Sequence, residues 1–127
     1  MRFKELIFES YSAYVLTKKS RSLLLNKFPP KFSKVDADHI TVKFGLNKTD
    51  RIPHEAKIQV VGYASDASLE CCVIAVNGKT VRPDGSTYHI TLSYDSGRKP
   101  VESNHLLKHG WTSVTPLDIS AKPTILK

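Results

Sequence analysis

Residues 88–94 read YHITLSY and residues 39–44 read HITVKF, so the triplet His-Ile-Thr occurs twice in the chain. Both stretches are rich in β-branched and aromatic residues, which favour extended strands. Because side chains alternate across a strand, the histidine and threonine of each copy share one face and the aliphatic residues share the other. Each strand can therefore bury its aliphatic face and present an imidazole beside a hydroxyl on the opposite face.

The sequence around these two stretches predicts more strands and at least one helix. Runs of aliphatic, aromatic and β-branched residues indicate further strands over Tyr11–Thr17, Lys57–Ala64, Leu69–Val76 and Trp111–Leu117. Asn77-Gly78 is a dipeptide favoured in tight hairpins, so a short return strand is expected over Lys79–Arg82.

The helical segments are marked by prolines. Lys18–Phe28 has an apolar stripe with basic residues elsewhere, which predicts an amphipathic helix, and Pro29 and Pro30 end it. Pro100–Lys108 predicts a second, short helix with proline in its first turn. The expected class is α+β, with a largely antiparallel sheet and one or two helices.

Composition indicates one soluble domain over residues 1–127, with 40% hydrophobic and 24% charged residues. A net charge of +7 favours an anionic, phosphate-bearing partner, although a basic surface also serves solubility alone. The apolar runs are too short to cross a membrane and the N-terminus lacks a secretory signal, so a cytoplasmic protein without membrane association is expected. Cys71 and Cys72 are adjacent in a predicted strand and are expected to be packing residues.

Two histidines and two threonines suit phosphodiester chemistry. Breaking a P–O bond requires a proton to leave the attacking oxygen and another to reach the leaving oxygen, and histidine performs either step near neutral pH. His39 and His89 are therefore the predicted acid–base pair, and the hydroxyls of Thr41 and Thr91 are predicted to hold the non-bridging oxygens. The scheme requires neither a metal ion nor a cofactor.

The paired motifs resemble the two signature motifs of the 2H phosphoesterase superfamily, which is named for such His-x-Thr/Ser-x pairs. The stretch KFPPKFSKVDADHITVKFG (residues 27–45) resembles the approach to the first motif in cyclic-phosphodiesterase-like members. The stretch RPDGSTYHITLSYDSGRKPVESN (residues 82–104) resembles the second motif of bacterial, phage and fungal tRNA-ligase-like members. The resemblance spans roughly residues 11–117 and is weaker between the motifs.

The resemblance implies a compact bilobal fold, in which two antiparallel sheets flank a central cleft and each lobe contributes one motif. It implies activities such as opening 2′,3′-cyclic phosphates, cleaving 2′-5′ linkages, trimming RNA ends or degrading cyclic oligonucleotide signals. The motifs are closer together in the chain than in many members, so reduced lobes are expected. His39 is expected to be the acid and His89 the base, an assignment that inverts with substrate orientation.

Other residues are candidate substrate contacts by their position near the motifs, although each is also an ordinary strand or surface residue. These are Lys43, Tyr88, Tyr94, Arg98 and Lys99, with Lys48 and Arg51 at the mouth of the cleft. Strand alternation places Lys43 in the cleft and Phe44 in the core. The other three histidines are not spaced as a metal site, and Trp111 is expected in the core or the cleft wall.

The sequence thus predicts a small, metal-independent phosphodiesterase acting on an RNA end or a nucleotide, without an obligate protein partner. Two alternatives stay open. One is a hydrolase of cyclic oligonucleotide second messengers, as in phage members that blunt host defence. The other is a module that binds a nucleotide or RNA end without turnover, which would not need an acid–base pair.

Overall fold

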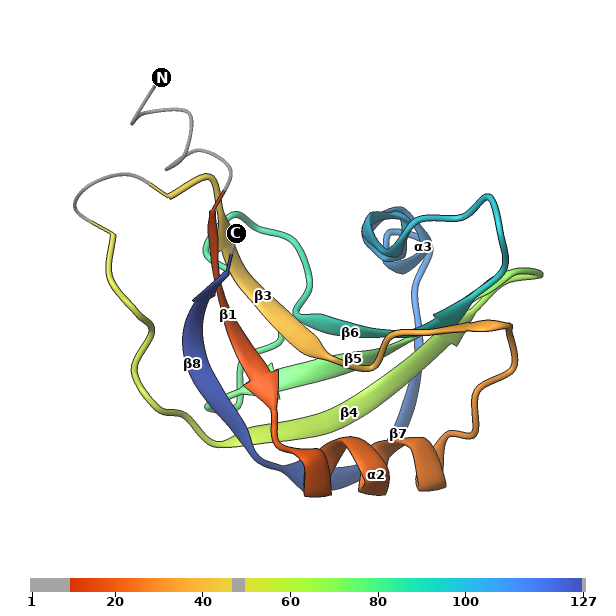
Figure 1. Ribbon diagram of the computed structural model, residues 1–127, viewed down its shortest axis with the longest axis horizontal. Coiled ribbons are helices and arrows are strands. Elements are labelled where there is room, and N and C mark those ends of the chain that lie inside the picture. The colour runs from red at the N-terminus through yellow and green to blue at the C-terminus, as the bar shows by residue number, and fades with distance from the viewer. Residues whose placement is uncertain (1–9, 47–49, 127) are drawn as a thin grey trace.

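The computed structural model describes residues 10–46 and 50–126. Eight strands, two α-helices and one 3₁₀ helix lie within these ranges (Figure 1). In chain order they are β1 (Tyr11–Leu16), α2 (Lys18–Lys27), β2 (Lys34–Val35), β3 (His39–Phe44), β4 (Ile58–Ser65), β5 (Leu69–Val76), β6 (His89–Tyr94), η1 (Pro100–Glu102), α3 (Ser103–Leu107), β7 (Thr112–Ile119) and β8 (Ala121–Leu126).

The strands form two antiparallel sheets, which confirms the predicted α+β class. One sheet has the order β3-β1-β8 and the other has the order β2-β6-β5-β4-β7. β3 belongs to the smaller sheet and β6 to the larger, and these two strands contact each other where the sheets meet (Figure 1). The two motif strands are therefore neighbours in space although they belong to different sheets.

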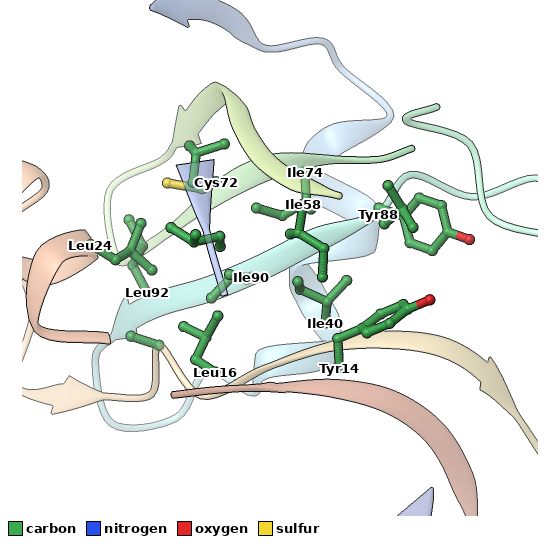
Figure 2. Close-up of a cluster of buried hydrophobic side chains, with 14 residues drawn as sticks. Tyr14, Leu16, Leu24, Ile40, Ile58, Cys72, Ile74, Tyr88, Ile90 and Leu92 are labelled. Carbon is green, nitrogen blue, oxygen red and sulfur yellow. The ribbon is translucent and has the colours of Figure 1, made fainter. Parts of the chain in front are cut away.

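The core lies between the two sheets and α2. Ile40 of β3 and Ile90 of β6 are fully buried and point into one cluster with Leu24 of α2 (Figure 2). Burying such a side chain contributes about 1.5–3 kcal/mol, so the aliphatic faces of both motif strands anchor them. The motif histidines and threonines are consequently left on the opposite face, as strand alternation predicts.

The larger sheet is covered on both faces. Cys72 of β5 packs in the main cluster, whereas its neighbour Cys71 packs in a second cluster with Leu107 of α3. α2 and α3 accordingly lie on opposite sides of this sheet (Figure 1). The adjacent cysteines face opposite ways as predicted, and both thiols are free and buried. Burial raises the pKa of Cys71 to about 12, so its reactive thiolate form is suppressed at neutral pH.

The first predicted helix is confirmed as α2. The Thr17 hydroxyl accepts a hydrogen bond from the Ser20 amide at 3.2 Å and so caps the first turn. The helix ends at Lys27, one residue before the predicted end, because Phe28 precedes Pro29 and a residue before proline is disfavoured in the helical region. The predicted second helix forms as η1 followed by α3.

One strand prediction needs correction, and two strands were not predicted. The expected return strand over Lys79–Arg82 is reduced to isolated bridges that join Val76 to Lys79 and Val81 to Thr87. β2 was missed because it has two residues, too few to show alternation. β8, which contains Pro123, was not predicted; it lies at a sheet edge, where proline is tolerated.

The chain crosses from the larger sheet to the smaller between β2 and β3. The amides of Asp36 and Ala37 donate hydrogen bonds of 2.8 Å to the carbonyls of Leu92 and Thr91 in β6. Ala37 then takes a φ of 51°, a left-handed conformation that is unfavourable by about 1–2 kcal/mol for a residue with a Cβ. Two residues later β3 begins at His39, so this turn brings the first motif beside β6. In the described ranges, no helix has the length and apolarity to cross a membrane.

Candidate active site

A cavity of about 360 Å³ lies where β3 and β6 meet. Its walls come from both sheets and from the η1–α3 segment. The lining residues are Tyr11, Asp36, His39, Thr41, Phe44, Arg82, His89, Thr91, Pro100, Val101 and Asn104. The structure thus brings together all four residues predicted to be catalytic, two from each motif.

His89 is arranged to act through one ring nitrogen. Its Nδ1 lies 2.9 Å from the carbonyl oxygen of Thr87. Because a carbonyl only accepts, Nδ1 carries the hydrogen, and Nε2 is left with the lone pair in the neutral ring. Burial lowers the pKa of His89, the bond to Thr87 partly opposes this, and the charges of Arg82 and His39 lower the pKa further. The neutral form, able to accept a proton, is therefore favoured near pH 7.

His39 has acidic neighbours instead. Its Nδ1 lies 3.2 Å from a carboxylate oxygen of Asp38, and its ring centroid lies 5.6 Å from that of Tyr11. The Asp36 carboxyl also lines the cavity, and burial raises its pKa while the charge of His39 opposes the rise. The contact with Asp38 engages Nδ1 and leaves Nε2 without a hydrogen-bond partner among the described residues. The two histidines therefore stand in different electrostatic surroundings.

The two motif threonines are not equivalent. Thr91 is 6% exposed, and its hydroxyl donates to the carbonyl of Pro100 at 3.2 Å and lies 2.9 Å from the Ser103 hydroxyl. Thr41 is half-buried, and no hydrogen bond joins its hydroxyl to another described residue. Thr41 is free to donate to a ligand, whereas Thr91 ties β6 to the η1–α3 segment.

Arg82 lines the cavity and was not predicted. The residue is 8% exposed, and its Nη2 lies 2.9 Å from a carboxylate oxygen of Asp84. Its buried Nε has no hydrogen-bond partner among the described residues. Arg82 stands at the start of the turn that precedes the second motif strand, and a basic residue in that place does not by itself indicate a residue of the cavity.

The prediction for Lys43 and Phe44 is wrong, because the pairing of β1 with β3 contains a bulge. Ser12 pairs with Lys43 and the next residue, Ala13, pairs with Thr41, so Val42 has no partner in the register. One extra residue reverses the faces that follow it. Phe44 is consequently 65% exposed and lines the cavity, where its ring stacks on Tyr11 at 5.7 Å. Lys43 instead pairs with Asp50, with 2.8 Å between Nζ and Oδ1.

Neither predicted tyrosine lines the cavity. Tyr88 is 8% exposed and belongs to the main core cluster, where its ring lies at the same end as Tyr14 (Figure 2). Tyr94 ends β6, where it pairs with Lys34 and Leu69. Tyr88 directly precedes the motif strand, so the alternation that places His89 in the cavity turns Tyr88 away from it.

The predicted basic contacts after the second motif also lie outside the cavity. Arg98 forms ion pairs with Asp66 and Glu102 and so joins two loops. Lys99 is exposed and precedes η1, with its amide donating to Glu102 at 3.1 Å. Of the two residues expected at the cleft mouth, Lys48 lies outside the described residues, and Arg51 is exposed away from the lining.

The remaining histidines and Trp111 serve other contacts. His105 and His109 form an edge-on ring pair with centroids 5.3 Å apart, and the carbonyl of His54 accepts a hydrogen bond from Tyr14. Within residues 10–46 and 50–126, no group of three or more histidine, cysteine, aspartate or glutamate side chains is placed to hold a metal ion. Trp111 is 39% exposed and packs on Gly62 of β4 rather than in the core or the cavity.

No protein-family model, curated protein or solved structure matches the chain. The resemblance to 2H phosphoesterases therefore rests on the two motifs and the residues around them, and the two motifs share one cavity.

Proposed function

We propose that the protein is a phosphodiesterase of the 2H type that hydrolyses a 2′,3′-cyclic phosphate on an RNA end or a nucleotide in the cytoplasm. One observation carries the proposal: two histidines from different sheets, distant in the sequence, line a single cavity together with the threonine two residues after each. A binding site alone would not need two imidazoles, each with one nitrogen anchored by an acceptor.

The surroundings of the two histidines support a division of roles. Neutral His89 takes a proton from water through Nε2, and the water oxygen forms a bond to phosphorus. The bond from phosphorus to the leaving ribose oxygen breaks, and His39, as an imidazolium, protonates that oxygen. The Thr41 hydroxyl donates to a non-bridging oxygen as negative charge builds up there. Solvent returns the proton from His89 to His39, so the net reaction adds one water molecule.

The size and walls of the cavity suit a nucleotide. Its volume of about 360 Å³ lies at the lower end of the range for small-molecule sites, about 300–1,000 Å³. Phe44 and Tyr11 form an aromatic wall on which a base can stack. The net charge of +7 favours approach of an anion.

Turnover in the presence of EDTA tests the proposal. The protein is incubated with 2′,3′-cyclic nucleotides, 2′-5′ dinucleotides and a panel of cyclic oligonucleotides. His39→Ala and His89→Ala are each expected to lower kcat/KM by about 10²–10⁴-fold. His105→Ala is the matched control, because His105 is exposed and lies outside the cavity. Circular dichroism checks that the variants fold.

Wild-type rates in both cavity variants would refute acid–base catalysis by this pair. Activity that disappears only on chelation would point to a metal enzyme instead. Turnover confined to cyclic oligonucleotides would keep the mechanism and replace the proposed substrate.

A further inference from the structure

We infer that Arg82, rather than Thr91, binds a non-bridging phosphoryl oxygen on the β6 side of the cavity, and that Thr91 is a positioning residue. This inference rests on the proposed function, because it concerns how the same site holds its phosphate. It departs from the symmetrical use of both threonines that the repeated motif suggests.

The Thr91 hydroxyl has one hydrogen, and that hydrogen is already used. It donates to the Pro100 carbonyl, which only accepts, so the Ser103 hydroxyl serves as donor to Thr91 in the contact of 2.9 Å. Thr91 is left with lone pairs, which repel an anionic oxygen. Donating to a phosphate would require Thr91 to abandon Pro100 at a position that is only 6% exposed.

The Arg82 guanidinium, in contrast, has more hydrogen-bond donors than acceptors nearby. It carries five N–H groups, and Asp84 is the side-chain acceptor that it meets among the described residues. The Arg82 side chain is 7% exposed whereas that of Asp84 is 52% exposed, so solvent screens the carboxylate more than the buried cation. The buried Nε has no hydrogen-bond partner among the described residues, which is unfavourable, and an anion in the cavity would provide the missing acceptor.

The backbone holds Arg82 in place beside His89. The Arg82 amide donates to Ser86 at 2.7 Å and its carbonyl accepts from Gly85 at 2.9 Å. Gly85 has a φ of 89°, so the tight turn favours glycine at this position. Thr87, two residues after Gly85, provides the carbonyl that anchors His89. One short turn therefore orients both the predicted base and the cation.

The oxygen contacts are then divided between the two walls. Thr41 of β3 supplies a neutral donor on one side, and Arg82 supplies a charged donor on the other. A planar guanidinium also binds two phosphate oxygens at once, which a hydroxyl does not. The substrate class that this arrangement fits is a phosphodiester with two unsubstituted, anionic oxygens at phosphorus.

Binding of inorganic phosphate tests the inference without relying on turnover. In wild-type protein labelled with ¹⁵N, the Nε resonance of Arg82, assigned by its loss in Arg82→Lys, is expected to shift as phosphate is added. Arg82→Gln is expected to weaken phosphate binding by about tenfold or more, as loss of a charge-assisted bond implies. Thr91→Val is expected to change the Kd by less than about threefold. Arg51→Gln is the control, because this arginine is exposed and lies outside the cavity.

Kinetics separate binding from positioning. With a 2′,3′-cyclic nucleotide, Arg82→Gln is expected to lower kcat/KM by about 10²–10³-fold, as removal of one oxyanion donor does. Thr91→Val should lower it less and mainly through kcat, and Thr91→Ser, which keeps the hydroxyl, should restore it.

An Arg82 resonance that does not move with phosphate would overturn the inference, even if Arg82→Gln fails to fold. So would a Thr91→Val variant that loses phosphate affinity as completely as Arg82→Gln. If wild-type protein binds phosphate through Arg82 but hydrolyses no diester, the proposed function fails and this inference stands.

Discussion

The hydrogen bonds of Thr91 with Pro100 and Ser103 predict a strong energetic coupling between two hydroxyls, which a double-mutant cycle measures. The variants are Thr91→Val, Ser103→Ala and the combination. Thr91→Val preserves the shape of the side chain and removes only the hydroxyl. The Ser103 hydroxyl, which is fully buried, is then left without its main partner, and so is the Pro100 carbonyl.

The magnitudes follow from which groups each change leaves unpaired. Ser103→Ala removes one bond, but Thr91 still donates to Pro100, so the loss of stability is expected to be about 1 kcal/mol. Thr91→Val leaves two groups without a hydrogen-bond partner, the Pro100 carbonyl and the Ser103 hydroxyl, and is expected to lower the free energy of unfolding by about 2–4 kcal/mol. The double variant leaves only the half-buried Pro100 carbonyl without a partner. Its loss of stability, about 1–2 kcal/mol, is therefore smaller than the sum of the losses in the two single variants. The neighbouring Cys71 thiol is a weak acceptor and relieves Ser103 only slightly.

Urea unfolding of all four proteins, followed by circular dichroism, gives the free energies of unfolding. Losses that simply add would show that the two hydroxyls do not interact and would refute the structural role assigned to Thr91. Each variant is also assayed for turnover. Because the Thr91 proton is directed to Pro100 and not to the substrate, the double variant should keep kcat/KM within about tenfold of wild type.

Three further predictions concern other parts of the molecule. Burial lowers the pKa of His89, so below pH ~6.5 this residue binds more protons in the unfolded chain than in the folded one. The free energy of unfolding should therefore fall as the pH drops from there toward the pKa of the folded state. In urea titrations at several pH values, His89→Ala should flatten that dependence by up to about one proton. Phe44→Ser should change stability by about 0.5 kcal/mol or less because Phe44 is 65% exposed, yet weaken binding of a nucleotide product by about 1–3 kcal/mol in calorimetry while leaving inorganic phosphate unaffected. In Gly62→Ala the new Cβ would lie 2.3 Å from Cε3 of Trp111, so the ring must move, with a loss of about 1–3 kcal/mol and a changed fluorescence maximum; an unchanged spectrum and stability would contradict that packing.

The long strands rich in apolar and β-branched residues were predictable from the sequence, whereas the convergence of the two motifs on one cavity was expected from the resemblance to 2H phosphoesterases. Ile40 and Ile90 mark a buried face on each strand, and the histidine and threonine beside them must then share the other face. The short β2 and the proline-containing β8 were not predictable, since neither shows the composition of an ordinary strand. Their positions depend on pairing with distant segments.

The sequence predicted the two histidines of the site, but it predicted fewer of the other residues that line the cavity. A bulge at Val42 depends on how β3 pairs with β1, and nothing in HITVKF marks it, so Phe44 and Lys43 were assigned to the wrong faces. Arg82 reaches the cavity because a turn folds it back toward His89, a tertiary placement that a basic residue before a turn does not reveal by itself. Conversely, Arg98 is close to the motif in sequence but is held by two carboxylates.

The two copies of His-Ile-Thr show why identical motifs need not have identical roles. Each motif strand buries its isoleucine and presents the same two polar groups, so strand geometry makes the copies equivalent. The elements packed against the two copies make them different. Thr91 lies under the η1–α3 segment and forms hydrogen bonds to it, while Thr41 faces the cavity without a partner among the described residues. If the first copy keeps its hydroxyl for the phosphate, the second must take its donor from elsewhere. Arg82 lines the same cavity and has a buried N–H group without an acceptor among the described residues. Because Thr41 donates to the phosphate and Thr91 donates to Pro100, Thr41→Val should reduce phosphate affinity more than Thr91→Val does.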